Sequence, residues 1–242
     1  MKSALAGLAV LLLAAPVQAG RTPYGWLEGT EVVPERGVEL ETWVQDLDNV
    51  GPLARDETQL WWAAVIGVTD QLEVALPIEV AWQRAGVVPG TTSLERWGAE
   101  ARYRLVTSDP VEAPALVPLV RVAVKREVDE RKAATVEAEA ALSYQRGCWQ
   151  AQVNLAARQL IHAGEDSVLV RPAAGVSVAV TSELRLGAEA VASIFARGAG
   201  TDWVAAGPNL AWTHGRFWLA ASLPVGLSSI DAAARVRWGI AF

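Results

Sequence analysis

The chain has 242 residues, 52% of them hydrophobic and 20% charged, and carries a formal net charge of −6. That length fits one large β-barrel or sandwich, or two small domains, and the scattered basic residues argue against a nucleic-acid partner. One cysteine, Cys148, rules out an intramolecular disulfide, and the two separated histidines, His162 and His214, offer little for a histidine-based metal or catalytic centre.

The first residues have the features of an export signal. Lys2 gives a short positive start, an apolar run covers residues 4–15, and Val17 and Ala19 have the spacing of a secretory cleavage site. The run is shorter than the roughly twenty residues that a membrane-spanning helix requires. We therefore expect residues 1–19 to be a removed signal peptide; the alternative is a buried N-terminal helix.

The next segment, residues 20–36, contains Tyr24 and Trp26 but no strand-like alternation. It forms either a periplasmic tail, which is the more frequent arrangement, or a plug that folds into the lumen of a barrel.

From residue 37 onward, apolar and polar residues alternate in short stretches. Because successive side chains of a strand point to opposite faces, a transmembrane strand reads as about ten such residues. The clearest case is 71–83, where Leu72, Val74 and Leu76 alternate with charged residues such as Glu73 and Glu79. The sequence predicts twelve strands: 37–46, 58–68, 71–83, 95–106, 115–125, 135–145, 149–159, 168–180, 184–194, 203–212, 217–225 and 232–242.

No later segment approaches the length of a transmembrane helix. Inside a bilayer every backbone polar group needs a partner in the protein, so strands can cross only as a closed barrel. The fold class predicted for residues 37–242 is therefore an all-β, transmembrane, antiparallel up-and-down β-barrel. A soluble periplasmic barrel or sandwich is the runner-up.

Connections should alternate between short turns on the inner side and longer loops on the outer side. The expected inner turns are 69–70, 107–114, 146–147, 181–182 and 213–216. The expected outer loops are 47–57, 84–94, 126–134, 160–167, 196–202 and 226–231. Only the connection from Thr107 departs from this order.

Aromatic residues on the expected lipid face gather near strand ends, as in the interfacial girdles of membrane barrels. A soluble core would not sort them in this way. The predicted outer-end residues are Trp62, Trp82 and Trp97, and the inner-end residues are Tyr103, Tyr144, Trp149, Trp212, Phe217, Trp238 and Phe242.

Prolines inside predicted strands oppose this interpretation, because each lacks a donor for the strand ladder. Pro118 and Pro224 lie near strand ends and are tolerable there. Pro77, Pro172 and Pro208 require bulges, local breaks in pairing or different strand boundaries.

The chain ends in an alternating stretch from Arg235 to the terminal Phe242, which resembles the C-terminal signal read by the assembly machinery of outer-membrane barrels. The related turns Val68–Glu73 and Val180–Arg185, together with the lead-in from Thr22 to Glu41, resemble the porin-like barrel family of phenol-degradation (meta-pathway) outer-membrane proteins. The resemblance implies a Gram-negative outer-membrane barrel. It implies little chemistry, because that family has no agreed catalytic motif.

The inward faces of the predicted strands are rich in charge, and neighbouring strands carry opposite signs. Such pairing either stabilises a filled barrel or lines a polar channel, and both can hold together. Twelve strands leave a narrow pore at most. The candidate lumen-lining residues are Glu39, Glu41, Glu73, Glu79, Arg96, Arg102, Arg104, Arg121, Lys125, Glu137, Glu139, Arg235 and Arg237.

The function predicted from the sequence is a porin-like channel for passive passage of small polar or charged solutes. Expected partners are outer-membrane lipid, the barrel-assembly machinery through Phe242 and an unidentified solute, with no nucleic acid, cofactor or metal. The alternatives are a non-conducting structural or surface barrel and a lipid hydrolase. A hydrolase would need His162 beside Ser167, which no recognisable motif frames, so no enzyme activity is expected.

Overall fold

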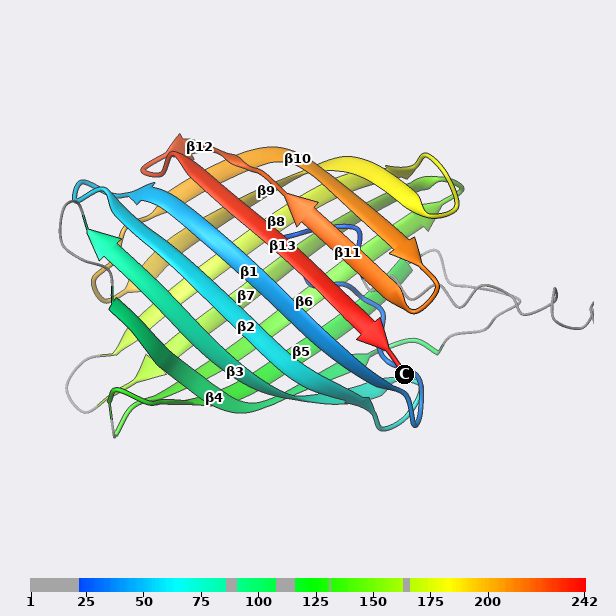
Figure 1. Ribbon diagram of the computed structural model, residues 1–242, viewed down its shortest axis with the longest axis horizontal. Helices are drawn as coiled ribbons and strands as arrows, with labels where there is room; N and C mark the ends of the chain where they lie inside the picture. The colour runs from blue at the N-terminus through cyan, green and yellow to red at the C-terminus, as the bar shows by residue number, and fades with distance from the viewer. Residues whose placement is uncertain (1–21, 86–90, 108–115, 131, 163–165) are drawn as a thin grey trace, which may run out of the picture.

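The computed structural model describes residues 22–85, 91–107, 116–130, 132–162 and 166–242. The described strands form one antiparallel sheet that closes on itself, because β1 pairs with both β2 and β13 (Figure 1). They are β1 (Val38–Val50), β2 (Arg55–Gly67), β3 (Leu72–Ala85), β4 (Thr91–Arg104), β5 (Leu116–Glu127), β6 (Ala134–Arg146), β7 (Trp149–Ile161), β8 (Ser167–Ala179), β9 (Leu184–Arg197), β10 (Trp203–His214), β11 (Phe217–Ser222), β12 (Val225–Ser228) and β13 (Ala232–Ala241).

β11 and β12 are two halves of a single barrel strand. Both pair with β10 on one side and with β13 on the other, and only Leu223 and Pro224 separate them. Proline has no N–H to give to the ladder, so the strand is interrupted where Pro224 stands. The predicted closed, up-and-down barrel of twelve strands is thereby confirmed, and one of its strands is interrupted and consists of β11 and β12.

The three problematic prolines lie at local breaks in pairing. Pro77 pairs with β2, but the register between β3 and β4 passes from Ala75 to Ile78. Pro172 pairs with β7, whereas the β8–β9 register passes from Val170 to Ala173. Pro208 pairs with β9 and has no register partner on β11 or β12. Each proline thus interrupts the ladder on one side only.

The loop prediction was wrong at the end of the barrel that carries the β1–β2 connection, called here the distal end. Residues 47–57 were expected to form a loop, yet Val50 pairs with Arg55 and only residues 51–54 remain between the strands. The polar ends of β1 and β2 continue the ladder because backbone pairing does not require apolar side chains. At the opposite end, called the terminal end, β1 begins and β13 ends; most of the expected 107–114 turn there lies outside the described residues.

The two faces of the barrel are reversed relative to a soluble protein. On β6, Glu137 and Glu139 are buried whereas Val136 and Leu142 are exposed. On β5, Val122 and Val124 are 56% and 58% exposed. An apolar belt outside and polar side chains inside are what a bilayer-spanning barrel requires. No helix in the described part of the chain is long and apolar enough to cross a membrane.

All ten predicted interface aromatics point outward, but two lie away from their expected height. Trp62 and Trp97 both align with Ile78, with several strand residues beyond them on each side. Their position at an outer strand end was therefore a wrong expectation, since β2 and β4 extend further than the sequence predicts. Trp82 lies near the distal end of β3. The residues near terminal strand ends are Tyr103, Tyr144, Trp149, Trp212, Phe217, Trp238 and Phe242.

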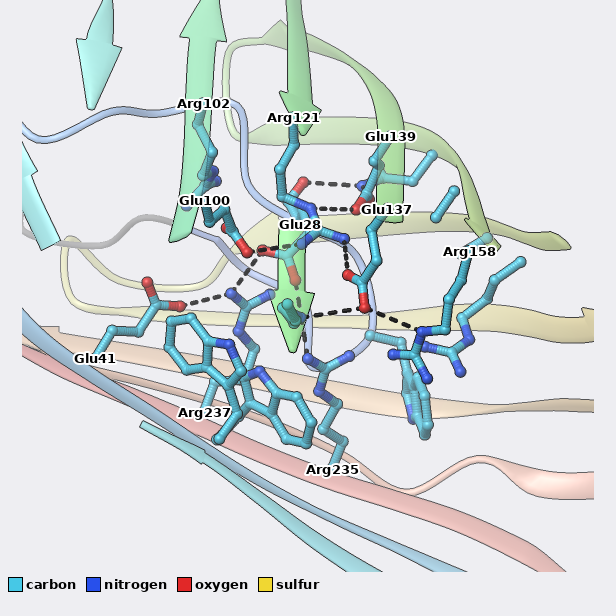
Figure 2. A pocket seen from close by; sticks show the side chains of 18 residues that line it. Glu28, Glu41, Glu100, Arg102, Arg121, Glu137, Glu139, Arg158, Arg235 and Arg237 are labelled. Carbon is cyan, nitrogen blue, oxygen red and sulfur yellow. Dashed lines mark hydrogen bonds and ion pairs between the residues drawn. The ribbon is translucent and has the colours of Figure 1, made fainter. Parts of the chain in front are cut away.

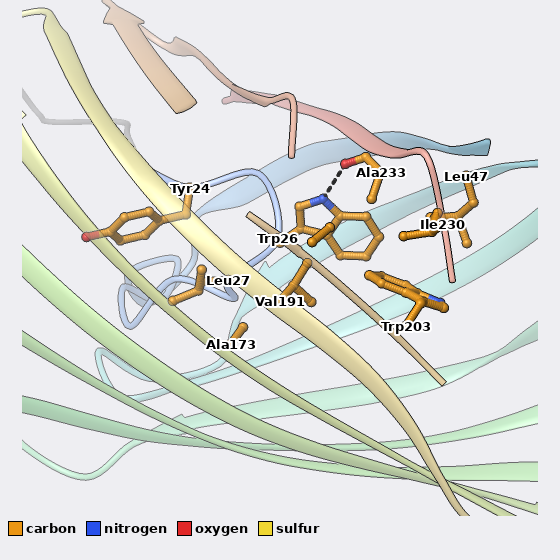
Figure 3. Close-up of a cluster of buried hydrophobic side chains, with 10 residues drawn as sticks. Tyr24, Trp26, Leu27, Leu47, Ala173, Val191, Trp203, Ile230 and Ala233 are labelled. Carbon is orange, nitrogen blue, oxygen red and sulfur yellow. Dashed lines mark hydrogen bonds between the residues drawn. The ribbon is translucent and has the colours of Figure 1, made fainter. Parts of the chain in front are cut away.

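Residues 22–33 lie inside the barrel rather than beside it. Tyr24 and Leu27 are fully buried, and Trp26 is 4% exposed (Figure 3). These side chains pack on residues of β1, β8, β9, β10 and β13, including Leu47, Val191 and Trp203. The largest described apolar cluster thus joins the N-terminal segment to the barrel wall. The predicted signal peptide, residues 1–19, lies outside the described residues.

Candidate functional site in the barrel interior

The charged side chains that the strand parity predicts to face inward lie in the described interior, and most of them form ion pairs there. Twelve of the thirteen candidates are buried, and the Arg121 side chain is 11% exposed. Arg96 pairs with Glu79 at 2.7 Å, and Arg102 pairs with Glu73 at 3.1 Å. These pairs join β3 to β4, as the predicted strand order requires.

Arg121 is the centre of the network on β4, β5 and β6. Its guanidinium lies 2.8 Å from Glu100, 3.1 Å from Glu137 and 3.0 Å from Glu139 (Figure 2). Lys125 binds Glu137 at 3.1 Å and also contacts Glu79 of β3. Because a buried ion without a partner is strongly unfavourable, these alternating charges stabilise one another in a water-poor interior.

Three predicted pairings take a different form. Arg237 does pair with Glu41, at 2.6 Å, but Glu39 accepts a hydrogen bond from Trp218 Nε1 at 2.8 Å. Arg235 lies between two tryptophans, with its guanidinium carbon 4.2 Å from the Trp43 ring centroid and 5.2 Å from that of Trp26. Arg104 was expected to pair with β3. It binds Glu31 of the N-terminal segment at 2.8 Å, because that segment lies between the walls.

The barrel wall binds the backbone of the N-terminal segment, residues 22–36, which we call the inner segment. Both carboxylate oxygens of Glu189 accept hydrogen bonds, from the N–H groups of Gly25 at 2.9 Å and Trp26 at 3.0 Å. Arg102 donates to the Gly29 carbonyl at 2.6 Å, and Arg237 donates to the Leu27 carbonyl at 3.1 Å. The wall therefore satisfies backbone groups that would otherwise be buried without partners.

Glu28 brings a second carboxylate of the inner segment, besides Glu31, to the arginines of the wall. Its carboxylate lies 2.8 Å from Arg237 and 3.8 Å from Arg235. Burial raises the pKa of Glu28, but the guanidinium of Arg237, then those of Arg102 and Arg121, outweigh burial and hold the pKa well below its usual range. Glu28 is therefore ionised whenever the segment is docked at neutral pH.

The space left inside the described barrel is small. A cavity of about 60 Å³ lies between the inner segment and the wall. A water molecule needs at least about 10–15 Å³ of such space, so the cavity has room for only a few waters. With the inner segment in this position, this cavity is too small for a solute much larger than a few waters.

Several charged residues of this interior were not among the candidates chosen from the sequence. Glu100, Arg158 and Glu189 have the inward parity of their strands, so alternation alone could have identified them. Arg171 follows the same rule on β8 but precedes Pro172, where the pattern is less regular. Glu28 has no such signal, since no periodicity marks the inner segment as part of the site.

The two histidines contact glutamates rather than serines. His162 Nε2 lies 3.6 Å from Glu130 Oε2, and His214 Nδ1 lies 2.9 Å from Glu183 Oε1. No group of three or more metal-binding side chains occurs in the described ranges.

Tyr24 anchors the tip of the inner segment against β8, which permits a direct test of docking. Burial raises the pKa of its phenol to about 12, and the neutral hydroxyl donates to the Gln150 carbonyl at 3.0 Å. A Cβ added at Gly175 would lie 2.6 Å from Tyr24 Cε1. Gly175→Val is therefore expected to weaken docking by about 1–3 kcal/mol through overpacking, while valine suits the strand itself.

The measurement is a thiol-exposure assay on the folded full-length chain. It records how fast a thiol reagent modifies the cysteine introduced by Thr30→Cys in a Cys148→Ser background; Thr30 is 3% exposed. Gly175→Val should raise this rate. Ala174→Val, on the exposed face next to it, is the control and should leave the rate unchanged. Equal rates in both variants would contradict the packing of Tyr24 on β8.

No family model and no curated protein matches the sequence. Solved structures match in shape at low identity. The NanC porin is 6% identical with a TM-score of 0.54, the alignment covering 84% of this chain and 98% of that chain. The KdgM porin, in complex with disordered oligogalacturonate, is 9% identical with a TM-score of 0.50, covering 85% and 99%.

The translocator domain of the autotransporter NalP from Neisseria meningitidis matches equally well. It is 10% identical with a TM-score of 0.53, and the alignment covers 85% of this chain and 87% of that chain. At such identities the likeness extends to the fold alone. The chain therefore has the closed antiparallel barrel fold that is seen in two porins and in an autotransporter translocator domain.

Proposed function

We propose that the protein is a narrow, gated channel of the bacterial outer membrane, whose inner segment closes the lumen at rest. The single observation that carries this proposal is the inner segment itself. It fills a charge-lined barrel, yet it is held there by hydrogen bonds, ion pairs and packing rather than by strand pairing, and it joins the wall at Gly37.

The location in a membrane rests on the reversed faces of the barrel. Exposed valines and leucines surround the barrel. Soluble monomeric proteins rarely expose so wide an apolar belt to water. The likeness to porins supports the same location. We orient the barrel in the membrane so that its terminal end, where β1 begins and β13 ends, faces the periplasm. Phe242, whose N–H donates to Val38, would then be presented to the assembly machinery as the sequence predicts.

The proposed cargo is a small polar or charged solute. If the inner segment left, the wall would expose rows of carboxylates and guanidiniums to water, and such rings select solutes by charge. The finer assignment, to the phenol-degradation (meta-pathway) porin-like family, rests on the turns and lead-in seen in the sequence. The similar solved structures share the barrel fold, and the family assignment is a proposal that goes beyond that fold.

A second candidate is a non-conducting barrel with a structural or surface role. The filled interior favours it, since the cavity of about 60 Å³ holds only a few waters. The two candidates differ in one respect: a channel requires that the inner segment can leave, whereas a scaffold does not.

A reversible cross-link separates them. The hydroxyl oxygens of Thr30 and Ser143 lie 2.7 Å apart, so Thr30→Cys with Ser143→Cys places two thiols within reach of a disulfide bond. The double variant, made with Cys148→Ser, should show no openings in planar bilayers when oxidised. Reduction should restore discrete, salt-dependent openings. Each single-cysteine variant controls for effects of the oxidant.

Openings that persist in the oxidised, fully cross-linked protein would show that ions do not follow the path blocked by the inner segment. A folded protein that stays silent after reduction would favour the non-conducting barrel. A further variant, Arg102→Ala, loses its pair with Glu73 and its bond to Gly29, and should change the conductance of an open pore.

A further inference from the structure

We infer that the barrel interior contains a binding site for a small carboxylate with an apolar, planar body, and that Trp26 and Glu28 occupy this site while the inner segment is docked. The inference names a ligand class for the proposed channel and rests on that function only in that the inner segment must be able to leave.

The first half of the site is cationic, and the carboxylate of Glu28 occupies it while the inner segment is docked. Arg235 and Arg237 line the cavity from β13 and are 5% and 2% exposed (Figure 2). Without Glu28, Arg237 would still have its ion pair with Glu41. For Arg235, in contrast, Glu28 is the only carboxylate within 4 Å among the described residues. Withdrawal of the segment would therefore leave Arg235 facing the lumen without a carboxylate within 4 Å in the described structure.

The docked segment does not saturate these arginines. The Nε atoms of Arg235 and Arg237 are buried and have no hydrogen-bond partner in the described structure. Arginine presents its N–H groups as a rigid fork that a carboxylate binds with two parallel hydrogen bonds. A free carboxylate is not constrained by a peptide backbone, so it can bind this fork more completely than Glu28 does.

The second half of the site is apolar and is filled by the indole of Trp26. The ring lies edge-on to Trp203, with centroids 5.8 Å apart, in a cluster that includes Leu47 and Val191 (Figure 3). The guanidiniums of Arg171 and Arg235 lie 5.7 and 5.2 Å from the same ring. Without Trp26, the wall would present an apolar hollow flanked by two cations, an arrangement that accepts a planar ring.

The two halves are adjacent, because Trp26 and Glu28 are two residues apart and an extended chain covers roughly 7 Å over that distance. A carboxylate attached to a ring or another compact apolar body would fill both halves at once. Such a ligand would compete with the inner segment for the same groups. By linkage, its binding would therefore favour the undocked state.

The test uses the thiol-exposure assay on the full chain, with benzoate as the probe. Benzamide, its neutral analogue, and acetate, which lacks the apolar body, are the comparison compounds. With benzoate at ten times its Kd for the undocked barrel, linkage predicts about a tenfold faster modification of the introduced thiol. Benzamide and acetate should each have a much smaller effect at the same concentration.

Two variants locate the effect. Arg235→Gln should abolish the response to benzoate. Arg104→Gln loosens the inner segment at its contact with Glu31, outside the site, and should raise the basal rate while retaining the fold-response to benzoate. If Arg235→Gln does not fold, Glu28→Gln serves instead. It removes the internal competitor, so the half-maximal benzoate concentration should fall.

Equal effects of benzoate and benzamide, equal effects of benzoate and acetate, or an unchanged response in Arg235→Gln would each overturn the site. The assay needs no ion flow, which keeps it separate from the channel proposal. A benzoate response in a protein that never conducts would retain the site and reject the channel. Conductance after reduction of the cross-link, without a benzoate response, would support the channel and reject the binding site.

Discussion

Replacing Arg121 by methionine is expected to lower the free energy of unfolding by about 3–5 kcal/mol, the range seen when one member of a buried ion pair is removed. Arg121 contacts three glutamates, and Glu100 has no other ion pair in the described structure. Methionine fills much of the space but leaves these carboxylates close together without their shared cation. Urea unfolding of the protein in lipid vesicles, followed by tryptophan fluorescence, measures the change.

The matched control is Arg216→Met in the exposed β10–β11 turn. A surface substitution of this kind should alter stability by no more than about 0.5 kcal/mol. A second comparison adds Glu100→Gln to Arg121→Met. If the orphaned carboxylate causes the loss, the double variant should be more stable than the sum of the two single effects predicts. Equal stability of Arg121→Met and Arg216→Met would mean that water, or a rearrangement of neighbouring side chains, replaces the interactions that the three glutamates make with Arg121.

Side-chain parity explains why so much of the barrel could be predicted from the sequence. Parity is local, and in an up-and-down barrel each strand neighbours the next, so facing pairs follow from the order of the strands. The contacts Glu73–Arg102 and Arg121–Glu139 lie where this reasoning puts them. Closure between β1 and β13 likewise brings Glu41 to Arg237.

The predictions failed where a local pattern was not the deciding factor. The polar end of β1, around Asp48 and Asn49, reads as a loop, but β1 continues the ladder with β2 and β13 through this stretch. The position of the inner segment depends on the shape and charge of a cavity built by strands far away in the sequence. Trp26, Glu28 and Glu31 carry no periodic signal, so the partners of Arg235 and Arg104 could not be assigned from strand order.

Glu189→Leu is expected to have the largest effect on the docking of the inner segment. The Glu189 carboxylate accepts the N–H groups of both Gly25 and Trp26, and the side chain is 3% exposed. Leucine would leave two buried donors without acceptors, each unfavourable by about 1–3 kcal/mol. A total of about 2 kcal/mol or more corresponds to at least about a 30-fold shift towards the undocked state, since 1.4 kcal/mol is tenfold.

The thiol-exposure assay should therefore show at least about a 30-fold faster modification in Glu189→Leu, and bilayer recordings should show a higher open probability. Glu183→Leu makes the same change in the exposed β8–β9 turn, where the Glu183 carboxylate lies 2.9 Å from His214 Nδ1, and should alter neither quantity. Faster modification without added openings would mean that the segment leaves a barrel that still does not conduct. An unchanged rate in Glu189→Leu would instead show that packing of Tyr24 and Trp26, rather than the carboxylate, holds the inner segment in place.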